Sequence, residues 1–301
     1  MTQHWQFGTR SDGRLIHAYR LRSDAGYEAV ILNQGAILQS FSLPNGRNVT
    51  LGFDEWNRYE SDTNYKGRII GPNANRIANA RFEIDDREHR LTANDGLHNL
   101  HSGPTGFDGE IWDAELTDRG LGLKLECPQA RHGFPGKIRA ALNISLIGNT
   151  LRFEMEATSN RPTPINLTWH PYWNLSGETR IDGHNLKVDA EMHTMWVTQK
   201  ALPVRDTFRD FRSSRPLGSV RLDCSYDQIK SARLTAGQSA MTITSSLPCL
   251  QVYTGDALPR SRAGIALEPQ FRPNDINFAQ DSLLQPGEIY RHWIEYRFDD
   301  I

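Results

Sequence analysis

The sequence is poor in cysteine and has no long hydrophobic run. Its three cysteines, Cys127, Cys224 and Cys249, lie far apart, and none belongs to a Cys-x-x-Cys or Cys/His group with zinc-ligand spacing. A disulfide framework and a structural zinc site are therefore not expected, and a reducing, cytoplasmic location fits best. No apolar run approaches the roughly 20 residues of a membrane-spanning helix, and the first residues predict no secretory signal.

The chain also lacks an excess of either charge and the motifs of several enzyme classes. It carries 34 Lys and Arg against 36 Asp and Glu in 301 residues, and the two signs are interspersed. Such a balance argues against a nucleic-acid or membrane-surface partner. No GxGxxG, Walker, GxSxG or HExxH pattern is present, so nucleotide-dependent, serine-hydrolase and zinc-protease chemistries lack their usual signatures. We expect neither a cofactor nor a metal.

Several segments of the sequence carry apolar residues at every second position. Residues 121–127, 151–157 and 290–298 alternate apolar with charged side chains, which is typical of strands buried on one face of an antiparallel sheet. Turn sequences such as Pro44-Asn45-Gly46 separate these runs. Only 54–59 and 202–212 resemble short helical turns. We therefore predict an all-β protein, one large antiparallel β-sandwich with very little helix, formed by a single domain over residues 1–301.

Four segments interrupt the alternation, and each admits two interpretations. Residues 71–79 contain three asparagines and Arg76, which offer many hydrogen-bond donors and acceptors. The alternative is a loop whose amides bond to their own backbone. Residues 94–103 place His98 and His101 beside glycines. Histidines in such a loop are otherwise solvated and without function.

The third and fourth segments are richer in chemistry. Residues 166–175 combine amides, aromatic rings and His170. A sugar presents apolar C–H faces and a ring of hydroxyls, so its site needs stacking aromatic rings and directional polar groups. Trp173 is a candidate for the stacking ring. The alternative is an aromatic core cluster. In residues 264–270 an apolar strand ends on Glu268. If this carboxyl is buried, its pKa is raised and it suits a general base. The alternative is a solvated strand end without such a role.

Taken in order, these segments resemble the signature blocks of the galactose mutarotase (aldose 1-epimerase) family. The blocks are ANRI at 74–77, NLHSG at 99–103, NLTWHPYWNL at 166–175 and LEPQ at 267–270. Weaker matches connect them, so the similarity covers nearly the whole chain. It implies a galactose mutarotase-like supersandwich that interconverts the α and β anomers of a free aldohexose, such as galactose or glucose, without a metal or nucleotide.

The resemblance also implies a role for each residue of the site. Glu268 is expected to take the proton from O1 of the sugar, His170 to protonate the ring oxygen, and His101 to polarise the same oxygens. The side chains expected to bind hydroxyls are Arg76, Asn75, Asp223 and Gln251, with Trp173 as the aromatic contact. Asp227 is the alternative to Asp223, because Cys224 and Ser225 depart from the His-Asn that usually follows the aspartate.

Other functions stay open at this stage. A sugar-binding or regulatory protein could keep the sandwich without turnover, although binding alone requires neither an acid nor a base. A hexose-6-phosphate mutarotase would need converging basic residues, for which Arg76 and Arg272 are the candidates; Pro72 stands where an arginine is common. An isomerase acting at C2 or C4, or a lyase, would place its acid and base differently. The expected partner is a small sugar, and both a monomer and a homodimer are compatible with the sequence.

Overall fold

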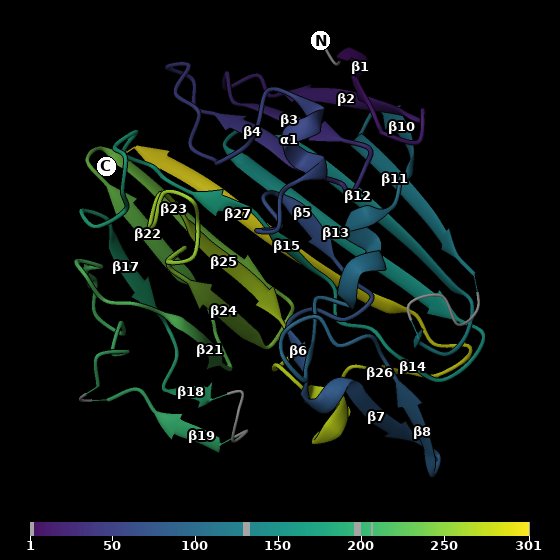
Figure 1. The fold of residues 1–301 in the computed structure, drawn as a ribbon. Helices are drawn as coiled ribbons and strands as arrows, with labels where there is room; N and C mark the ends of the chain where they lie inside the picture. The colour runs from purple at the N-terminus through teal and green to yellow at the C-terminus, as the bar shows by residue number, and fades with distance from the viewer. Residues whose placement is uncertain (1–2, 129–132, 196–199, 206, 301) are drawn as a thin grey trace.

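Two large antiparallel sheets dominate the computed structural model, which describes residues 3–300 apart from 129–132, 196–199 and 206. The nine-stranded sheet contains, in order, β10 (Asp113–Thr117), β11 (Gly120–Cys127), β12 (Ile138–Ile147), β13 (Thr150–Ser159), β27 (Tyr290–Asp300), β23 (Ser239–Ser245), β22 (Ala232–Ala236), β17 (Asn185–Val188) and β20 (Arg215–Pro216). The six-stranded sheet contains β16 (Tyr172–Trp173), β25 (Ile265–Gln270), β24 (Cys249–Tyr253), β21 (Asp223–Asp227), β18 (Met192–Met195) and β19 (Lys200–Pro203). Figure 1 shows β11, β12, β13 and β27 running side by side.

The remaining strands form smaller sheets around these two. A four-stranded sheet contains β1 (Gln3–Thr9), β2 (Leu15–Arg22), β3 (Glu28–Leu32) and β4 (Leu38–Ser42). Four antiparallel pairs join β5 (Arg68–Ile70) with β15 (Thr168–His170), β6 (Arg76–Ile77) with β9 (Asn99–Leu100), β7 (Arg81–Ile84) with β8 (Arg87–Arg90), and β14 (Thr163–Pro164) with β26 (Leu283–Leu284).

Helix is scarce, as the sequence predicts. The described part of the chain holds α1 (Trp56–Glu60) and the 3-10 turns Ala78–Ala80, Gly103–Thr105, Phe107–Gly109 and Asp275–Asn277. The helical turn expected at 54–59 is confirmed by α1. The one expected at 202–212 is wrong, because its described residues form the end of β19 followed by turns. None of the described helices is long and apolar enough to cross a membrane.

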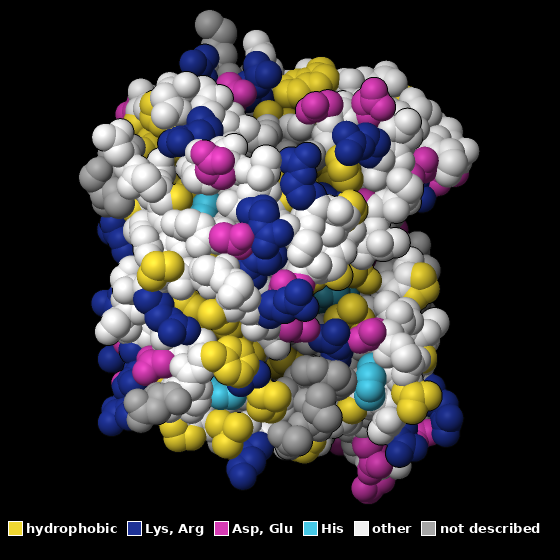
Figure 2. All heavy atoms as spheres, turned by 60° about the vertical axis from the view of Figure 1, so that its left-hand side comes forward, with side chains coloured by type: hydrophobic (Ala, Val, Ile, Leu, Met, Phe, Trp, Pro, Cys, Tyr) yellow, Lys and Arg dark blue, Asp and Glu magenta, His cyan; other side chains and the backbone are white. Residues whose placement is uncertain are grey.

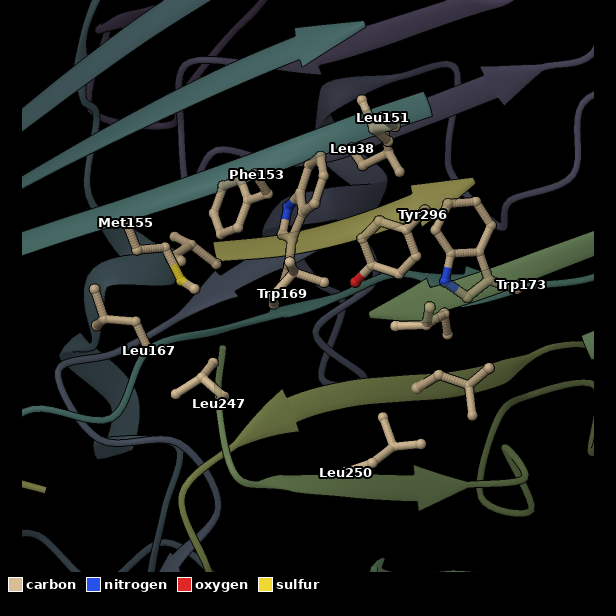
Figure 3. Close-up of a cluster of buried hydrophobic side chains, with 14 of the residues drawn as sticks. Leu38, Leu151, Phe153, Met155, Leu167, Trp169, Trp173, Leu247, Leu250 and Tyr296 are labelled. Carbon is tan, nitrogen blue, oxygen red and sulfur yellow. The ribbon is translucent and has the colours of Figure 1, made fainter. Parts of the chain in front are cut away.

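One hydrophobic core lies between the two large sheets, and the alternating residues fill it as predicted. On β13, Leu151, Phe153 and Met155 are fully buried. Figure 3 shows these side chains in one cluster with Tyr296 of β27, and Leu250 of β24 approaches that cluster from the opposite sheet. Trp169 stacks on Phe153 with ring centroids 4.5 Å apart and donates its indole N–H to the Ala36 carbonyl. The core thus fixes the inner face of the six-stranded sheet and leaves its other face available for a site.

Candidate active site

Two neighbouring strands of the six-stranded sheet present polar side chains on the face that points away from the core. On β24 and β25, Leu250, Val252 and Leu267 are fully buried in the core. Because successive side chains of a strand point to opposite faces, the residues between them point the other way. Gln251 lies directly opposite Glu268 in the strand register. Strand pairing therefore brings these two predicted site residues side by side.

His170 reaches the same place from a separate short strand pair. It lies opposite Arg68 in the β15–β5 pair, and its carbonyl accepts a hydrogen bond from the Gly67 N–H. Its Nε2 lies 3.4 Å from Oε1 of Glu268, and the two side chains are only 5% and 2% exposed. Oε2 of Glu268 is buried and accepts no hydrogen bond from the described residues. An imidazole and a carboxyl therefore face each other in a largely desolvated position.

The short β6–β9 strand pair adds Asn75, Arg76 and His101. Asn75 and His101 adopt left-handed backbone angles, with φ of 61° and 53°, a region that non-glycine residues rarely occupy outside constrained positions. The Asn75 N–H donates to Nδ1 of His101 over 3.1 Å. Nε of Arg76 donates to Asp95 over 2.7 Å. These bonds fix both the histidine ring and the guanidinium against the site.

A cavity of about 310 Å³ joins these groups, a volume at the small end of the range for ligand sites. A larger recess of about 690 Å³ adjoins it, and Thr63 and Asn64 line both. The smaller cavity is the candidate active site because the polar groups converge there. Figure 2 shows acidic and basic side chains interspersed over one face, with a histidine recessed in a hollow near its middle. The cavity is lined by Thr63, Asn64, Tyr65, Asn75, Arg76, Leu100, His101, His170, Tyr172, Asp223, Gln251, Tyr253, Ala257 and Glu268.

Burial shifts the protonation of the three central groups. It lowers the pKa of His170 to about 4 and holds the pKa of His101 well below 6.5, with further lowering by His170 and Arg76. Burial also raises the pKa of Glu268 well above its usual value, a shift that Asp223 increases and Arg76 opposes. Each effect disfavours the charged form in a desolvated site. Burial therefore shifts the His170–Glu268 pair toward a neutral imidazole and a protonated carboxyl.

His101, His170 and Glu268 could also be considered as metal ligands, since one ligand atom from each lies within 4.8 Å of the others. The hydrogen bond to His101 argues against this role. Its Nδ1 accepts the Asn75 N–H, so in the neutral ring Nε2 carries the proton. A protonated nitrogen can donate to a sugar oxygen but cannot ligate a metal. The donor set therefore suits hydrogen bonding to a hydroxylated ligand better than metal binding.

The structure places seven of the eight predicted site residues around this cavity. They are Glu268, His170, His101, Arg76, Asn75, Asp223 and Gln251. Asp223 rather than Asp227 lines the cavity, and its Oδ1 accepts a hydrogen bond from Gln251 over 2.6 Å. Asp227 is 1% exposed and bonds instead to Thr194 and Cys249. Arg272 also lies outside the cavity lining, 3.5 Å from Asp227.

The prediction that Trp173 contacts the substrate is wrong. Its side chain is fully buried and packs against Tyr296 and Phe41 in the core. The reason is the alternation of the strand: Tyr172 lines the cavity, so its neighbour Trp173 points to the opposite face. Trp169 likewise lies in the core (Figure 3).

Several aromatic and polar residues of the site are not among those predicted from the sequence. Tyr65, Tyr172 and Tyr253 line the cavity, and Asp95 binds Arg76 from outside it. Tyr172 belongs to the motif at 166–175. Once His170 is assigned to the cavity, strand alternation predicts that Tyr172, two residues later, points to the cavity as well. Tyr65 and Asp95 occur in loops without a distinctive pattern, so no signal in the sequence alone identifies them.

Known proteins of one family resemble this chain along nearly its whole length. The family model described as aldose 1-epimerase matches residues 17–297. The human galactose mutarotase is 28% identical over an alignment that covers 96% of this chain and 95% of the relative. The aldose 1-epimerase of Escherichia coli K12 is 29% identical, with 95% and 96% covered.

Solved structures share the fold. An aldose epimerase homologue from C. elegans superimposes with a TM-score of 0.89 at 27% identity, covering 94% of this chain and 98% of the other. The galactose 1-epimerase of Lactobacillus acidophilus gives a TM-score of 0.91 at 24% identity, with 100% and 99% covered. The two-sheet architecture predicted from the sequence is thus also that of known structures.

Proposed function

This chain belongs to the aldose 1-epimerase family, and we propose that it interconverts the α and β anomers of a free aldohexose, with galactose and glucose as the first candidates. The observation that carries the proposal is the distance of 3.4 Å between Nε2 of His170 and Oε1 of Glu268 at the buried end of the cavity. O1 and O5 of a cyclic aldose are attached to the same carbon. The acid and the base that serve them must therefore lie close together, as these two groups do.

The reaction needs one proton to be taken and one to be given. Glu268, as carboxylate, accepts the proton of the O1 hydroxyl while the C1–O5 bond breaks and O5 takes a proton from the imidazolium of His170. The open-chain aldehyde then turns about the C1–C2 bond. On closure, O5 attacks the other face of C1 and returns its proton to His170, and Glu268 returns the other to O1. No proton is consumed overall, so the cycle needs no outside reductant, oxidant or cofactor.

The remaining side chains support this cycle. The Nε2–H of His101 is suited to donate to the reacting oxygens, and the guanidinium of Arg76 favours the ionised form of Glu268. Asp223 and Gln251, joined by their own hydrogen bond, offer acceptors and donors to the ring hydroxyls. Among the described lining residues, Arg76 is the one Lys or Arg side chain in the cavity. This supports a neutral sugar over a phosphorylated one.

Polarimetry of freshly dissolved α-galactose and α-glucose tests the proposal. The wild-type protein is expected to speed the approach to the equilibrium rotation above the buffer rate. Because Arg58, Lys66 and Arg260 line the adjoining recess, the 6-phosphates are measured beside the free sugars. Acceleration on the phosphates alone would replace the free-sugar proposal. Binding of the free sugars without acceleration would favour a non-catalytic sugar-binding protein.

The pH dependence of kcat/KM is expected to be bell-shaped, with a wide plateau. Only the form of the His170–Glu268 pair with one titratable proton has both an acid and a base. A second proton arrives on the buried imidazole close to pH 4, which removes the base at lower pH. The proton is lost well above the usual range of Glu, because burial raises the pKa of Glu268. Initial rates corrected for the buffer reaction measure both limbs, and an acid limb near pH 6.5 would contradict the assignment.

Replacing Asp223 with asparagine is expected to raise KM by about tenfold to a hundredfold, the effect of losing a charged hydrogen bond to the sugar. kcat should change less, because Asp223 lies outside the acid–base pair. The matched control is Asp227→Asn, whose carboxyl is buried against Thr194 and Cys249. It should lower the melting temperature and leave KM unchanged. The opposite pattern, with KM raised only in Asp227→Asn, would reverse the assignment.

A further inference from the structure

A short loop between α1 and β5 forms one wall of the cavity and is closed by a buried ion pair. Nζ of Lys66 lies 2.5 Å from Oδ1 of Asp62, and the two side chains are 8% and 2% exposed. Oδ2 of Asp62 also accepts the Lys66 N–H. On its other side, Nζ of Lys66 lies 4.7 Å from the centre of the Phe53 ring. The ion pair therefore joins the two ends of the loop, and the contact with Phe53 fixes the Lys66 end.

Tyr65 lies inside this closed loop in a strained conformation. Its φ is +55°, which is an outlier for a bulky residue and therefore energetically costly. Hydrogen bonds hold the backbone around it: its carbonyl accepts the Arg68 N–H, and the N–H of Gly67, two residues further on, donates to the carbonyl of His170. The loop that carries Tyr65 is thus attached directly to the backbone of a proposed catalytic residue. Strain of this kind persists only where the surrounding structure imposes it.

The ring of Tyr65 contacts the two histidines of the cavity. Its centroid lies 4.6 Å from that of His101 in an edge-to-face arrangement and 6.2 Å from that of His170. The two imidazoles are themselves 5.6 Å apart, edge to face. Burial raises the pKa of the Tyr65 hydroxyl to about 12, so the side chain stays neutral. An uncharged ring in this position limits both the rotation of the imidazoles and their access to water.

We propose that Tyr65 is a positioning residue, whose ring holds His101 and His170 in register with Glu268 and whose loop is locked by the Asp62–Lys66 ion pair. The role rests on the proposed function, because the two histidines are assigned there to the sugar oxygens. It differs from the roles of the motif residues, since Tyr65 acts through other side chains. The edge-to-face contacts of His101 with Tyr65 and with His170 supply both the attraction and the fixed angle that such a role requires.

Two variants of Tyr65 separate the effect of the ring from the effects of the hydroxyl and of the backbone strain. Tyr65→Phe keeps the ring and is expected to retain most of kcat. Tyr65→Gly removes the ring but suits the left-handed backbone angle, so it should fold. It is expected to lower kcat by about a hundredfold, the size of effect that a misplacement of about 1 Å produces, with a smaller change in KM. Activity of Tyr65→Gly close to wild type, or equal losses in both variants, would overturn the positioning role of the ring.

A second readout does not depend on catalysis. Proton NMR of the imidazole Cε1–H signals follows the titration of His101 and His170 in each variant. Opening the site to water in Tyr65→Gly should raise both pKa values toward 6.5, whereas Tyr65→Phe should leave them depressed. The groups that face the two histidines stay in place in both variants; they are Glu268, Arg76, Asp62, Lys66 and Tyr172.

The kinetic and NMR measurements together distinguish a failure of the proposed function from a failure of the positioning role. A wild-type protein without anomer exchange, but with histidine titrations that shift only in Tyr65→Gly, would defeat the proposed function while showing that the ring shields the two imidazoles. An active wild-type protein whose histidine titrations are the same in Tyr65→Gly would defeat the positioning role and keep the function.

Discussion

Replacing Glu268 with glutamine is expected to slow catalysed anomer exchange by about 10³-fold, within the range of about 10²–10⁴ that a general base supplies. The amide keeps the shape of the side chain but cannot accept the proton of O1. The affinity for the sugar should change little, because hydrogen bonds from the other lining residues remain. Exchange rates and sugar binding, measured on the same preparation, separate these two effects.

The stability of Glu268→Gln provides an internal check. Folding places the carboxyl where burial raises its pKa, so the ionised form disfavours the folded state near neutral pH. A neutral amide removes that cost, and the melting temperature should stay the same or rise. Glu115→Gln, at an exposed position of β10, is the matched control and should leave both rate and stability unchanged. Loss of folding in Glu268→Gln, or a full rate in the folded variant, would contradict the role of the base.

His170→Gln is the second change with a large expected effect, about 10²–10³-fold on kcat, because ring opening then lacks its proton donor to O5. Adding Glu268→Gln to it should cost little more, since residues that act as one unit are strongly non-additive. Rates of the two single variants and the double variant on one sugar measure this coupling. A double variant that loses the product of the two single effects would show that the groups act independently.

His98→Gln is the control for the loss of an imidazole. His98 accepts the Asn79 N–H through Nδ1 and is absent from the described lining of the cavity. Its replacement should leave anomer exchange unchanged. A loss comparable to that of His170→Gln would show that the rate is sensitive to loop structure rather than to the proton donor.

The sequence predicts the fold well because alternation is a local property. The apolar residues of 121–127, 151–157 and 290–298 became the core faces of β11, β13 and β27, since each strand buries one face against the same core. The expected helical turn at 202–212 failed because strand pairing takes Leu202 and Pro203 into β19. The core side chains Val204 and Phe211 are then buried from the turns that follow the strand rather than from a helix face. Strand pairing is not local: that Gln251 lies opposite Glu268 depends on a register that the sequence alone does not specify.

The site was predictable only in part, for a similar reason. Residues as distant as Asn75, His170 and Glu268 were placed together by the family resemblance and not by their spacing. The prediction for Trp173 is wrong because a motif specifies residue types but not the face of the strand to which each side chain points. The side chain of Tyr172 lines the cavity, whereas that of Trp173 lies in the core. Tyr65 has no motif, and its role follows from a left-handed backbone angle and ring contacts that appear only in three dimensions.

The most direct test of Glu268 as the base of a mutarotase is saturation transfer between the anomeric protons of galactose and of glucose, at equilibrium, with the wild-type protein and with Glu268→Gln. Irradiating one anomer is expected to reduce the signal of the other in the presence of the wild-type protein, and this transfer is expected to fall to the buffer level with Glu268→Gln. Transfer that persists undiminished in the folded Glu268→Gln variant, or that is absent with the wild-type protein while both sugars bind, would contradict this role of Glu268.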